Sequence, residues 1–184
     1  VACIPAVIVG LLFDDLVDEY LYNYMVVAIA LIIFGIAFIA TEILIKNKKP
    51  KCKTMDELSY IDALIIGFFQ VLAAVFPGTS RSGATIVGSL MIGISREVAA
   101  KFTFFMAIPV MLGASLLKIM KYNGVITINE LLLLGIGMVS AFLVSIVIIK
   151  FLLSYIRKHD FKVFGIYRII LGILVIVFFR FVFK

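Results

Sequence analysis

Residues Tyr24 to Ile45 form one long apolar run that contains a single charged side chain, Glu42. As one helix, a run of this length covers the roughly 30 Å hydrocarbon core of a bilayer. The rest of the chain is similar, because 64% of its residues are hydrophobic and 15% are charged, against about 25% charged in a soluble domain. The sequence therefore predicts an all-α, polytopic integral membrane protein with a single membrane domain over residues 1–184.

About five transmembrane helices are expected, at residues 1–12, Tyr24–Ile45, 102–117, 131–153 and 164–182. The chain begins with Val1, already in apolar sequence, so we expect the first helix to be truncated and the chain to be a C-terminal fragment. The last three helices fill residues 102–184, after a basic loop at 46–60 and a shorter apolar segment at 61–94.

The segment 61–94 is expected to enter the membrane and return on the same side. Its second arm, 84–94, reaches only about 16 Å as a helix, about half of the hydrocarbon core. A full span would bury Arg96, Glu97 and Lys101, at roughly 2.5–3.5 kcal/mol for each charge near a helix centre. A re-entrant helical hairpin avoids this cost. It also places residues 78–83 at membrane depth, where irregular backbone must lie inside protein or beside a watery cavity.

Basic residues divide unequally between the two sides of this topology. The side from which the hairpin enters holds Lys46, Lys48, Lys49, Lys51, Lys53, Arg96, Lys101, Lys150, Arg157, Lys158 and Lys162. The opposite side holds Lys118, Lys121, Arg180 and Lys184. By the positive-inside rule the basic loops are cytoplasmic and the C-terminus lies outside. The net charge of +6 is therefore explained by topology and does not indicate a nucleic-acid partner.

The turn of the hairpin reads "FPGTSRSGAT" over residues 76–85. Backbone amides freed by Gly78 and Gly83, at the start of a helical arm, form a natural anion site. Arg81 adds a planar fork that matches phosphate oxygens. Hydroxyl donors are supplied by Thr79, Ser80, Ser82 and Thr85. This pattern predicts a site for phosphate or diphosphate at membrane depth.

The same residues also have purely structural interpretations. Small and hydroxyl residues let membrane helices pack closely, and Arg81 could pair with Glu42 or with a backbone carbonyl. Gln70 either points into the same cavity or bonds to a neighbouring helix. Arg168 is interpreted as an interfacial anchor and His159 as a solvated loop residue. Glu42, near the end of its span, is interpreted as an interfacial charge.

The stretch "GFFQVLAAVFPGTSRSGATIVGSLMIGISREVAAKFTFFMAIPVMLGA", residues 67–114, resembles the bacterial undecaprenyl-diphosphate phosphatase family, also called the bacitracin-resistance family. The resemblance extends over nearly the whole chain and implies two inverted repeats, of which residues 1–45 end the first. It implies an enzyme of the bacterial inner membrane that hydrolyses undecaprenyl diphosphate to undecaprenyl phosphate and phosphate. This reaction recycles the lipid carrier of peptidoglycan synthesis and confers bacitracin resistance.

The resemblance also implies roles for single residues. Arg81 would clamp the diphosphate and Ser80 would take part in catalysis, while Gly78, Thr79 and Ser82 complete the cradle. A divalent cation, Mg²⁺ or Ca²⁺, would bridge phosphate oxygens, with its ligands mostly outside this chain. The implied partner is a polyprenyl diphosphate lipid in the membrane, and assembly as a homodimer is left open.

One departure from the family pattern limits what this chain can do. The family carries a glutamate-rich stretch followed by a Pro-Val-Ser-Ser-type turn with a histidine, and this sequence has no match to it. Gln70 stands where repeat symmetry would place the first glutamate, so we expect the chain alone to be inactive. Val87 stands where another superfamily of membrane lipid phosphatases has histidine, which excludes that superfamily. A transporter or flippase for a phosphorylated lipid or anion remains the alternative.

Overall fold

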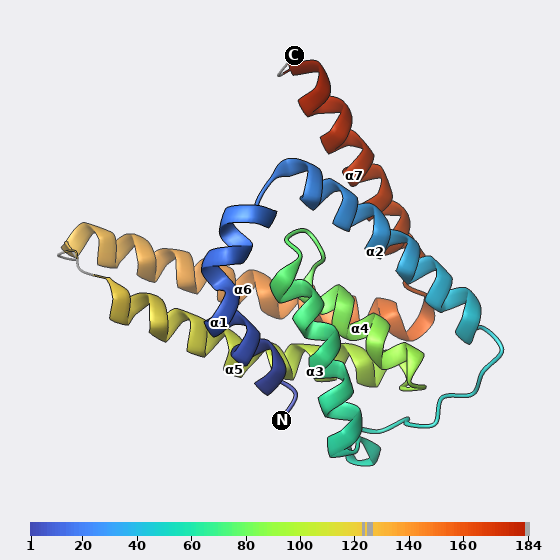
Figure 1. Ribbon diagram of the computed structural model, residues 1–184. Helices are drawn as coiled ribbons and strands as arrows, with labels where there is room; N and C mark the ends of the chain where they lie inside the picture. The colour runs from blue at the N-terminus through green and yellow to red at the C-terminus, as the bar shows by residue number, and fades with distance from the viewer. Residues whose placement is uncertain (123, 125–126, 183–184) are drawn as a thin grey trace.

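The computed structural model describes residues 1–122, 124 and 127–182, and does not describe the side chains of residues 11, 13–20 and 157. The described chain is built from helices (Figure 1), which confirms the predicted all-α class. The elements are α1 (Ile4–Leu21), α2 (Tyr24–Ile45), a 3₁₀ helix (Met55–Glu57), α3 (Tyr60–Val75), α4 (Arg81–Met91), α5 (Arg96–Lys121), α6 (Ile128–Lys158) and α7 (Lys162–Val182).

Four helices of the described chain, α2, α5, α6 and α7, are long and apolar enough to cross a membrane. The protein is therefore a multi-pass membrane protein, as its composition predicts. The expected truncated span at residues 1–12 falls in α1, which is not among these four helices and continues to Leu21. No glycine or proline follows Gly10 before Asn23, so nothing in this stretch interrupts the helix. The acidic side chains at 14, 15, 18 and 19 lie outside the described residues.

Helices α3 and α4 pack against each other and form a helical hairpin (Figure 1). The start of α3 is fixed by a capping box, in which Ser59 accepts from the Asp62 N–H and Asp62 accepts from the Ser59 N–H. The second arm begins at Arg81 and not at residue 84, because Ser80 provides the N-cap. With 16 and 11 residues, both arms are shorter than a membrane span. Re-entry of the hairpin into the membrane stays a prediction.

Helices α2 and α7 run antiparallel and side by side (Figure 1). The Tyr24 and Phe179 rings stack at 4.5 Å between centroids where α2 begins and α7 ends. The backbones touch at two glycines: a Cβ on Gly165 would lie 2.7 Å from the Gly35 carbonyl oxygen, and the reverse distance is also 2.7 Å. Small residues thus let these two helices approach more closely than larger side chains would permit.

Glu42 joins three helices at one end of the molecule. Its side chain is 1% exposed. It accepts a hydrogen bond from Arg96 Nε at 2.9 Å, a second from Arg96 Nη2, and a third from the Phe161 backbone N–H at 3.0 Å. Glu42 is therefore a buried, paired carboxylate, while its depth at the membrane interface stays a prediction. Removing one partner of such a buried pair typically costs about 3–5 kcal/mol.

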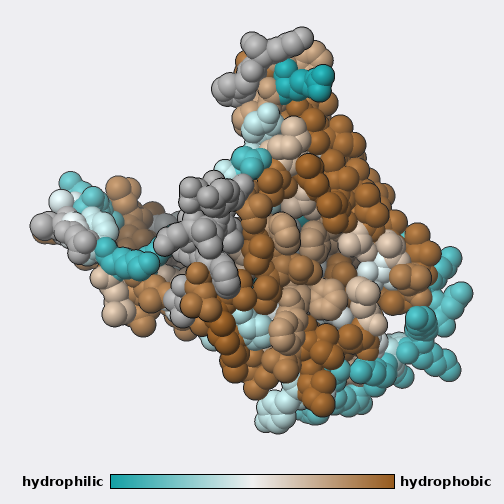
Figure 2. Space-filling view, viewed as in Figure 1, coloured by the Kyte–Doolittle hydropathy of each residue, from teal (hydrophilic) through white to brown (hydrophobic). Residues whose placement is uncertain are grey.

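The surface of the molecule is apolar over most of the face seen in Figure 2, and hydrophilic side chains gather over the loop between α2 and α3. The spanning window of α6 has no residue buried inside the protein. An exposed apolar area of this extent is a lipid or protein contact surface. This distribution agrees with a chain whose helices face the bilayer.

Candidate active site

The turn between α3 and α4 is held against α2. Gly78 has a φ of 89°, and a Cβ there would lie 2.6 Å from the carbonyl oxygen of Val27. Only glycine combines this conformation with this close approach. Pro77 stands just before it and cannot continue α3. The two residues together set the position of residues 79–83.

Ser80 has the only positive φ among the described non-glycine residues, with φ 66° and ψ 113°. Such backbone conformations cost about 1–3 kcal/mol and gather at functional sites. The Ser80 hydroxyl oxygen accepts a hydrogen bond from the Gly83 N–H at 3.2 Å and lies 3.3 Å from the Ser82 hydroxyl oxygen. The strained residue therefore caps α4 and brings two hydroxyls to its N-terminus.

The first turn of α4 offers hydrogen-bond donors to an anion. The backbone N–H groups of Arg81 and Ser82 stand at the first two positions of the helix, where no carbonyl precedes them within the helix. The positive end of the helix dipole lies at the same place. The Ser80 and Ser82 side chains are exposed beside these groups. The first turn of α4 therefore has the donors that the predicted anion site requires.

The Arg81 side chain is half-buried, and it forms no hydrogen bond or ion pair with any residue that the structure describes. Its alternative interpretation as a partner of Glu42 is wrong, because Arg96 occupies that carboxylate. Arg81 thus lies between the two exposed serines in sequence, and no hydrogen bond or ion pair within the described part of the chain holds its guanidinium.

The two threonines of the turn region have different surroundings, although both are fully buried. The Thr85 hydroxyl lies 2.9 Å from the Thr103 hydroxyl and donates to the Arg81 carbonyl oxygen, so it ties α4 to α5. The Thr79 hydroxyl and both amide atoms of Gln70 are buried without a partner among the described residues. Buried polar atoms without a protein partner are usually satisfied by water or by a ligand. Thr79 and Gln70 therefore keep free hydrogen-bonding capacity.

Arg168 of α7 belongs to this site, although the sequence analysis interpreted it as an interfacial anchor. It is 8% exposed, and its Nη2 donates to the carbonyl oxygens of Gly78 and Thr79, each at 2.7 Å. The anchor interpretation is therefore wrong. A signal for it was present, because Arg168 lies within the predicted span at 164–182, and charged residues within spans are functional by default.

A cavity of about 230 Å³ lies among α4, α5, α6 and α7. It brings Ser80, Ser82 and Gly83 together with Arg168. The remaining lining residues are Phe38, Ile86, Ala100, Thr103, Phe104, Leu152, Ile156, Phe161, Phe164 and Tyr167. Of the sequence-predicted residues, Gly78, Thr79, Arg81, Thr85 and Gln70 are outside this lining. The cavity therefore has a small polar wall and a large apolar one.

The polar groups of the cavity match an anion. Arg168 is the one charged side chain among its described lining residues, which include no carboxylate and no imidazole. Mg²⁺ and Ca²⁺ prefer carboxylate and other oxygen ligands. The cavity therefore does not fit the divalent cation that the family resemblance implies. His159 lines a different pocket and stacks on Tyr155 at 4.3 Å, so it provides no base here.

Comparison with known proteins decides the family. The family model described as "Bacitracin resistance protein BacA" matches residues 1–174. The chain belongs to the BacA family. BacA-family relatives include undecaprenyl-diphosphatase 1 of Clostridium acetobutylicum, which is 59% identical over 97% of this chain and 65% of the relative. The undecaprenyl-diphosphatase of Desulfitobacterium hafniense is 57% identical over 97% of this chain and 64% of the relative.

A third BacA-family relative, the undecaprenyl-diphosphatase of Enterococcus faecalis, is 56% identical over 96% of this chain and 63% of its own length. The family resemblance carried by residues 67–114 is thereby confirmed. The chain spans slightly less than two thirds of the length of these relatives.

Proposed function

We propose that this chain forms the phosphate-binding part of an undecaprenyl-diphosphate phosphatase. The observation that carries the proposal is the strained Ser80, which caps α4 and lines a cavity together with Ser82 and Arg168. Phosphoryl transfer depends mainly on positioning and on stabilising charge on the phosphoryl oxygens. Amides, hydroxyls and a guanidinium supply this stabilisation without rearrangement.

In this proposal the Ser80 hydroxyl donates its proton in a hydrogen bond to a phosphate oxygen, because its lone pair already accepts the Gly83 N–H. Ser82 and the first amides of α4 bind the remaining oxygens. Arg81, which has no partner among the described residues, reaches the outer phosphate as a bidentate clamp. In this proposal the group that breaks the bond comes from the family's N-terminal hairpin motif, which this sequence does not match, so we expect the chain alone to be inactive.

The substrate in this proposal is a lipid whose tail stays in the membrane. The cavity of about 230 Å³ is smaller than the roughly 300–1,000 Å³ of a pocket that encloses a drug-sized ligand. It has room for a phosphate group and not for a polyprenyl chain. The exposed apolar faces of the helices beside it are suitable for the tail.

The proposed orientation places the basic loop 46–60 in the cytoplasm and the C-terminus outside, in the bacterial inner membrane. One common pocket supports a shared side for the basic segments, because its lining combines residues from three of them: Lys48, Lys49, Arg96 and Lys158. The proposal assigns no ligand of the implied Mg²⁺ or Ca²⁺ to this chain. Titration of the activity with each metal, and with a chelator, measures that dependence separately.

The test uses an extended protein, made by fusing this chain to the part of the Clostridium acetobutylicum relative that lies outside the matched region. Release of inorganic phosphate from undecaprenyl diphosphate is measured in detergent. The extended protein should release phosphate, and the chain alone should not. Arg81→Ala in the extended protein should remove most activity without lowering the unfolding temperature. Arg81→Lys should recover little, since it keeps the charge and loses the fork.

Arg180→Ala is the matched control, since Arg180 is an exposed arginine near the end of α7. It should leave phosphate release unchanged. Full activity in the Arg81→Ala variant would refute the clamp. Movement of the lipid diphosphate between leaflets without any phosphate release would replace the phosphatase with a transporter.

A further inference from the structure

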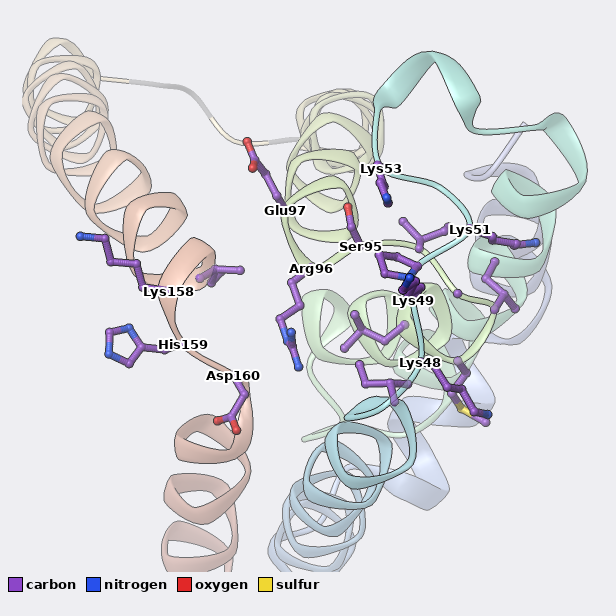
Figure 3. A pocket seen from close by; sticks show the side chains of 18 residues that line it. Lys48, Lys49, Lys51, Lys53, Ser95, Arg96, Glu97, Lys158, His159 and Asp160 are labelled. Atoms are coloured by element: carbon purple, nitrogen blue, oxygen red, sulfur yellow. The ribbon is translucent and has the colours of Figure 1, made fainter.

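A second pocket, of about 910 Å³, lies at the end of the molecule where Glu42 joins three helices. Three segments that are distant in sequence surround it (Figure 3). They are the basic loop after α2, the turn from α4 into α5, and the junction between α6 and α7. This pocket shares only Ile156 with the lining of the smaller cavity. It is therefore a separate site.

The lining is strongly basic. It contains Lys48, Lys49, Lys51, Lys53, Arg96 and Lys158, against the carboxylates Glu97 and Asp160. Both carboxylates are already neutralised, because Glu97 pairs with Lys101 at 2.7 Å and Asp160 pairs with Lys162 at 3.0 Å. The hydrogen bond from Lys162 also holds the pKa of Asp160 below its usual range.

Three of these lysines, Lys48, Lys49 and Lys158, are exposed and have no carboxylate partner among the described residues. Lys51 pairs with Asp62 at 3.0 Å and Arg96 with Glu42, while Lys53 lies beside the Glu57 carboxylate, which accepts from its backbone N–H. Like charges gathered around one hollow repel each other unless an anion lies between them. The excess of positive charge in the pocket therefore favours the binding of an anion.

Ser95 gives an independent indication of a ligand. It is the N-cap of α5, yet its side chain makes no capping hydrogen bond. Its hydroxyl oxygen is buried without a partner among the described residues, and the residue lines the pocket. The N-terminus of a 26-residue helix lies at the same place, and helix N-termini bind phosphate groups through free amides. A donor, a helix dipole and several cations therefore meet in one hollow.

The position of the pocket indicates a membrane lipid. Its walls include Ile45 and Ile156, at the ends of two apolar spans, and Met91, which is 58% exposed. Ends of spans lie at the depth of lipid headgroups, and basic pockets there bind anionic headgroups. The volume is within the range of pockets that enclose a small ligand. A soluble anion would not need the apolar part of the wall.

We propose that this pocket binds the phosphate headgroup of an anionic membrane phospholipid, with Lys49 and the neighbouring Lys48 at the phosphate and its glycerol end against the apolar wall. The bound lipid holds the basic loop against the α6–α7 junction.

The test measures binding of fluorescent phosphatidylglycerol to the extended protein in phosphatidylcholine nanodiscs. The variant Lys48→Gln/Lys49→Gln removes two exposed, unpaired lysines and should weaken binding about ten- to thirtyfold. The matched control Lys118→Gln/Lys121→Gln removes the same charge from the last turn of α5, away from the pocket, and should change binding less than about twofold. A separate single variant, Ser95→Ala, should weaken lipid binding by a smaller factor than Lys48→Gln/Lys49→Gln.

Two outcomes would overturn the proposal. Equal weakening by both double variants would mean that net charge alone attracts the lipid. Competition by inorganic phosphate at the same affinity as the lipid would mean that the pocket recognises a free anion. Phosphate release from undecaprenyl diphosphate is a different readout, so the failure of this proposal would leave the proposed phosphatase intact.

Discussion

Ser80 holds a backbone conformation that glycine adopts more readily than serine, and it keeps a side chain that glycine lacks. The hydroxyl caps α4 through the Gly83 N–H. The protein therefore accepts strain at this residue and obtains a hydroxyl at the mouth of the cavity. Two substitutions of Ser80 distinguish the effect of its backbone strain from the effect of its hydroxyl.

Ser80→Gly should relieve the positive φ, worth about 1–2 kcal/mol, and lose only a few tenths of a kcal/mol as an N-cap. Ser80→Ala keeps the strain and loses the cap, which costs about 1 kcal/mol. Thermal unfolding should therefore occur at a higher temperature in Ser80→Gly than in Ser80→Ala. Both variants of the extended protein should lose most phosphate release, because both lack the hydroxyl.

The control for this pair is Ser154→Ala, at an exposed serine of α6, which should change neither quantity. A Ser80→Gly protein with full phosphate release would show that the hydroxyl serves only the helix cap.

The phosphate-binding turn could be predicted from sequence because its donors are consecutive. Ser80, Ser82 and Gly83 come together through local backbone geometry alone, and the cavity lining includes all three. Arg168 could not be placed, since its hydrogen bond to Gly78 joins residues 90 positions apart. The sequence around Arg168 does not indicate that α7 packs against the turn at residues 78–83. The role of Thr85 depends in the same way on Thr103 of another helix.

At the scale of elements, the contact between α2 and α7 depends on two glycines. The two backbones approach closely at this crossing, so close packing contributes to the stability. Ala in place of Gly165 would set its Cβ 2.7 Å from the Gly35 carbonyl oxygen, which is closer than real Cβ contacts allow. The two backbones would have to separate.

Gly165→Ala should therefore lower the free energy of unfolding by about 1–3 kcal/mol. Gly137→Ala in α6 is the matched control, because a Cβ there has nothing within 4 Å. It should be neutral or slightly stabilising, since alanine is the better helix former. Denaturation of both variants in one detergent gives the comparison. A Gly165→Ala protein as stable as Gly137→Ala would mean that the crossing can relax at little cost.

The helices themselves could be predicted from apolar length and charge spacing. The expected span at 131–153 lies inside α6, which runs from Ile128 to Lys158, and its start follows from the capping box of Thr127 and Glu130. The continuation of α1 to Leu21 could not be predicted from hydropathy, because acidic residues interrupt the apolar run and a helix tolerates them.

At the scale of the whole molecule, basic residues that the sequence assigns to one side line one pocket. The last turn of α5 carries Lys118 and Lys121, at the opposite end of that helix from Arg96 and Glu97 of the pocket. Assembly as a homodimer stays a prediction. The orientation of the two ends relative to the cell can be measured directly.

Single cysteines at the two ends, in a chain with Cys3 and Cys52 replaced by alanine, should react differently with a membrane-impermeant thiol reagent. Lys121→Cys should be labelled in intact cells, because the sequence assigns it to the outside. Lys49→Cys should be labelled only after the cells are permeabilised, because the basic loop is cytoplasmic by the positive-inside rule. The reverse pattern would invert the proposed topology.

The bond between Glu42 and Arg96 also has a consequence for biosynthesis. The two residues are 54 positions apart, so α2 leaves the ribosome before its partner has been made. Burying such a carboxylate without its partner typically costs about 3–5 kcal/mol, so the protein cannot close around Glu42 at that stage. Once α5 has been synthesised, Arg96 can neutralise it. The contact between α2 and α5 at this pair thus forms late, and the order of translation becomes part of how this protein folds.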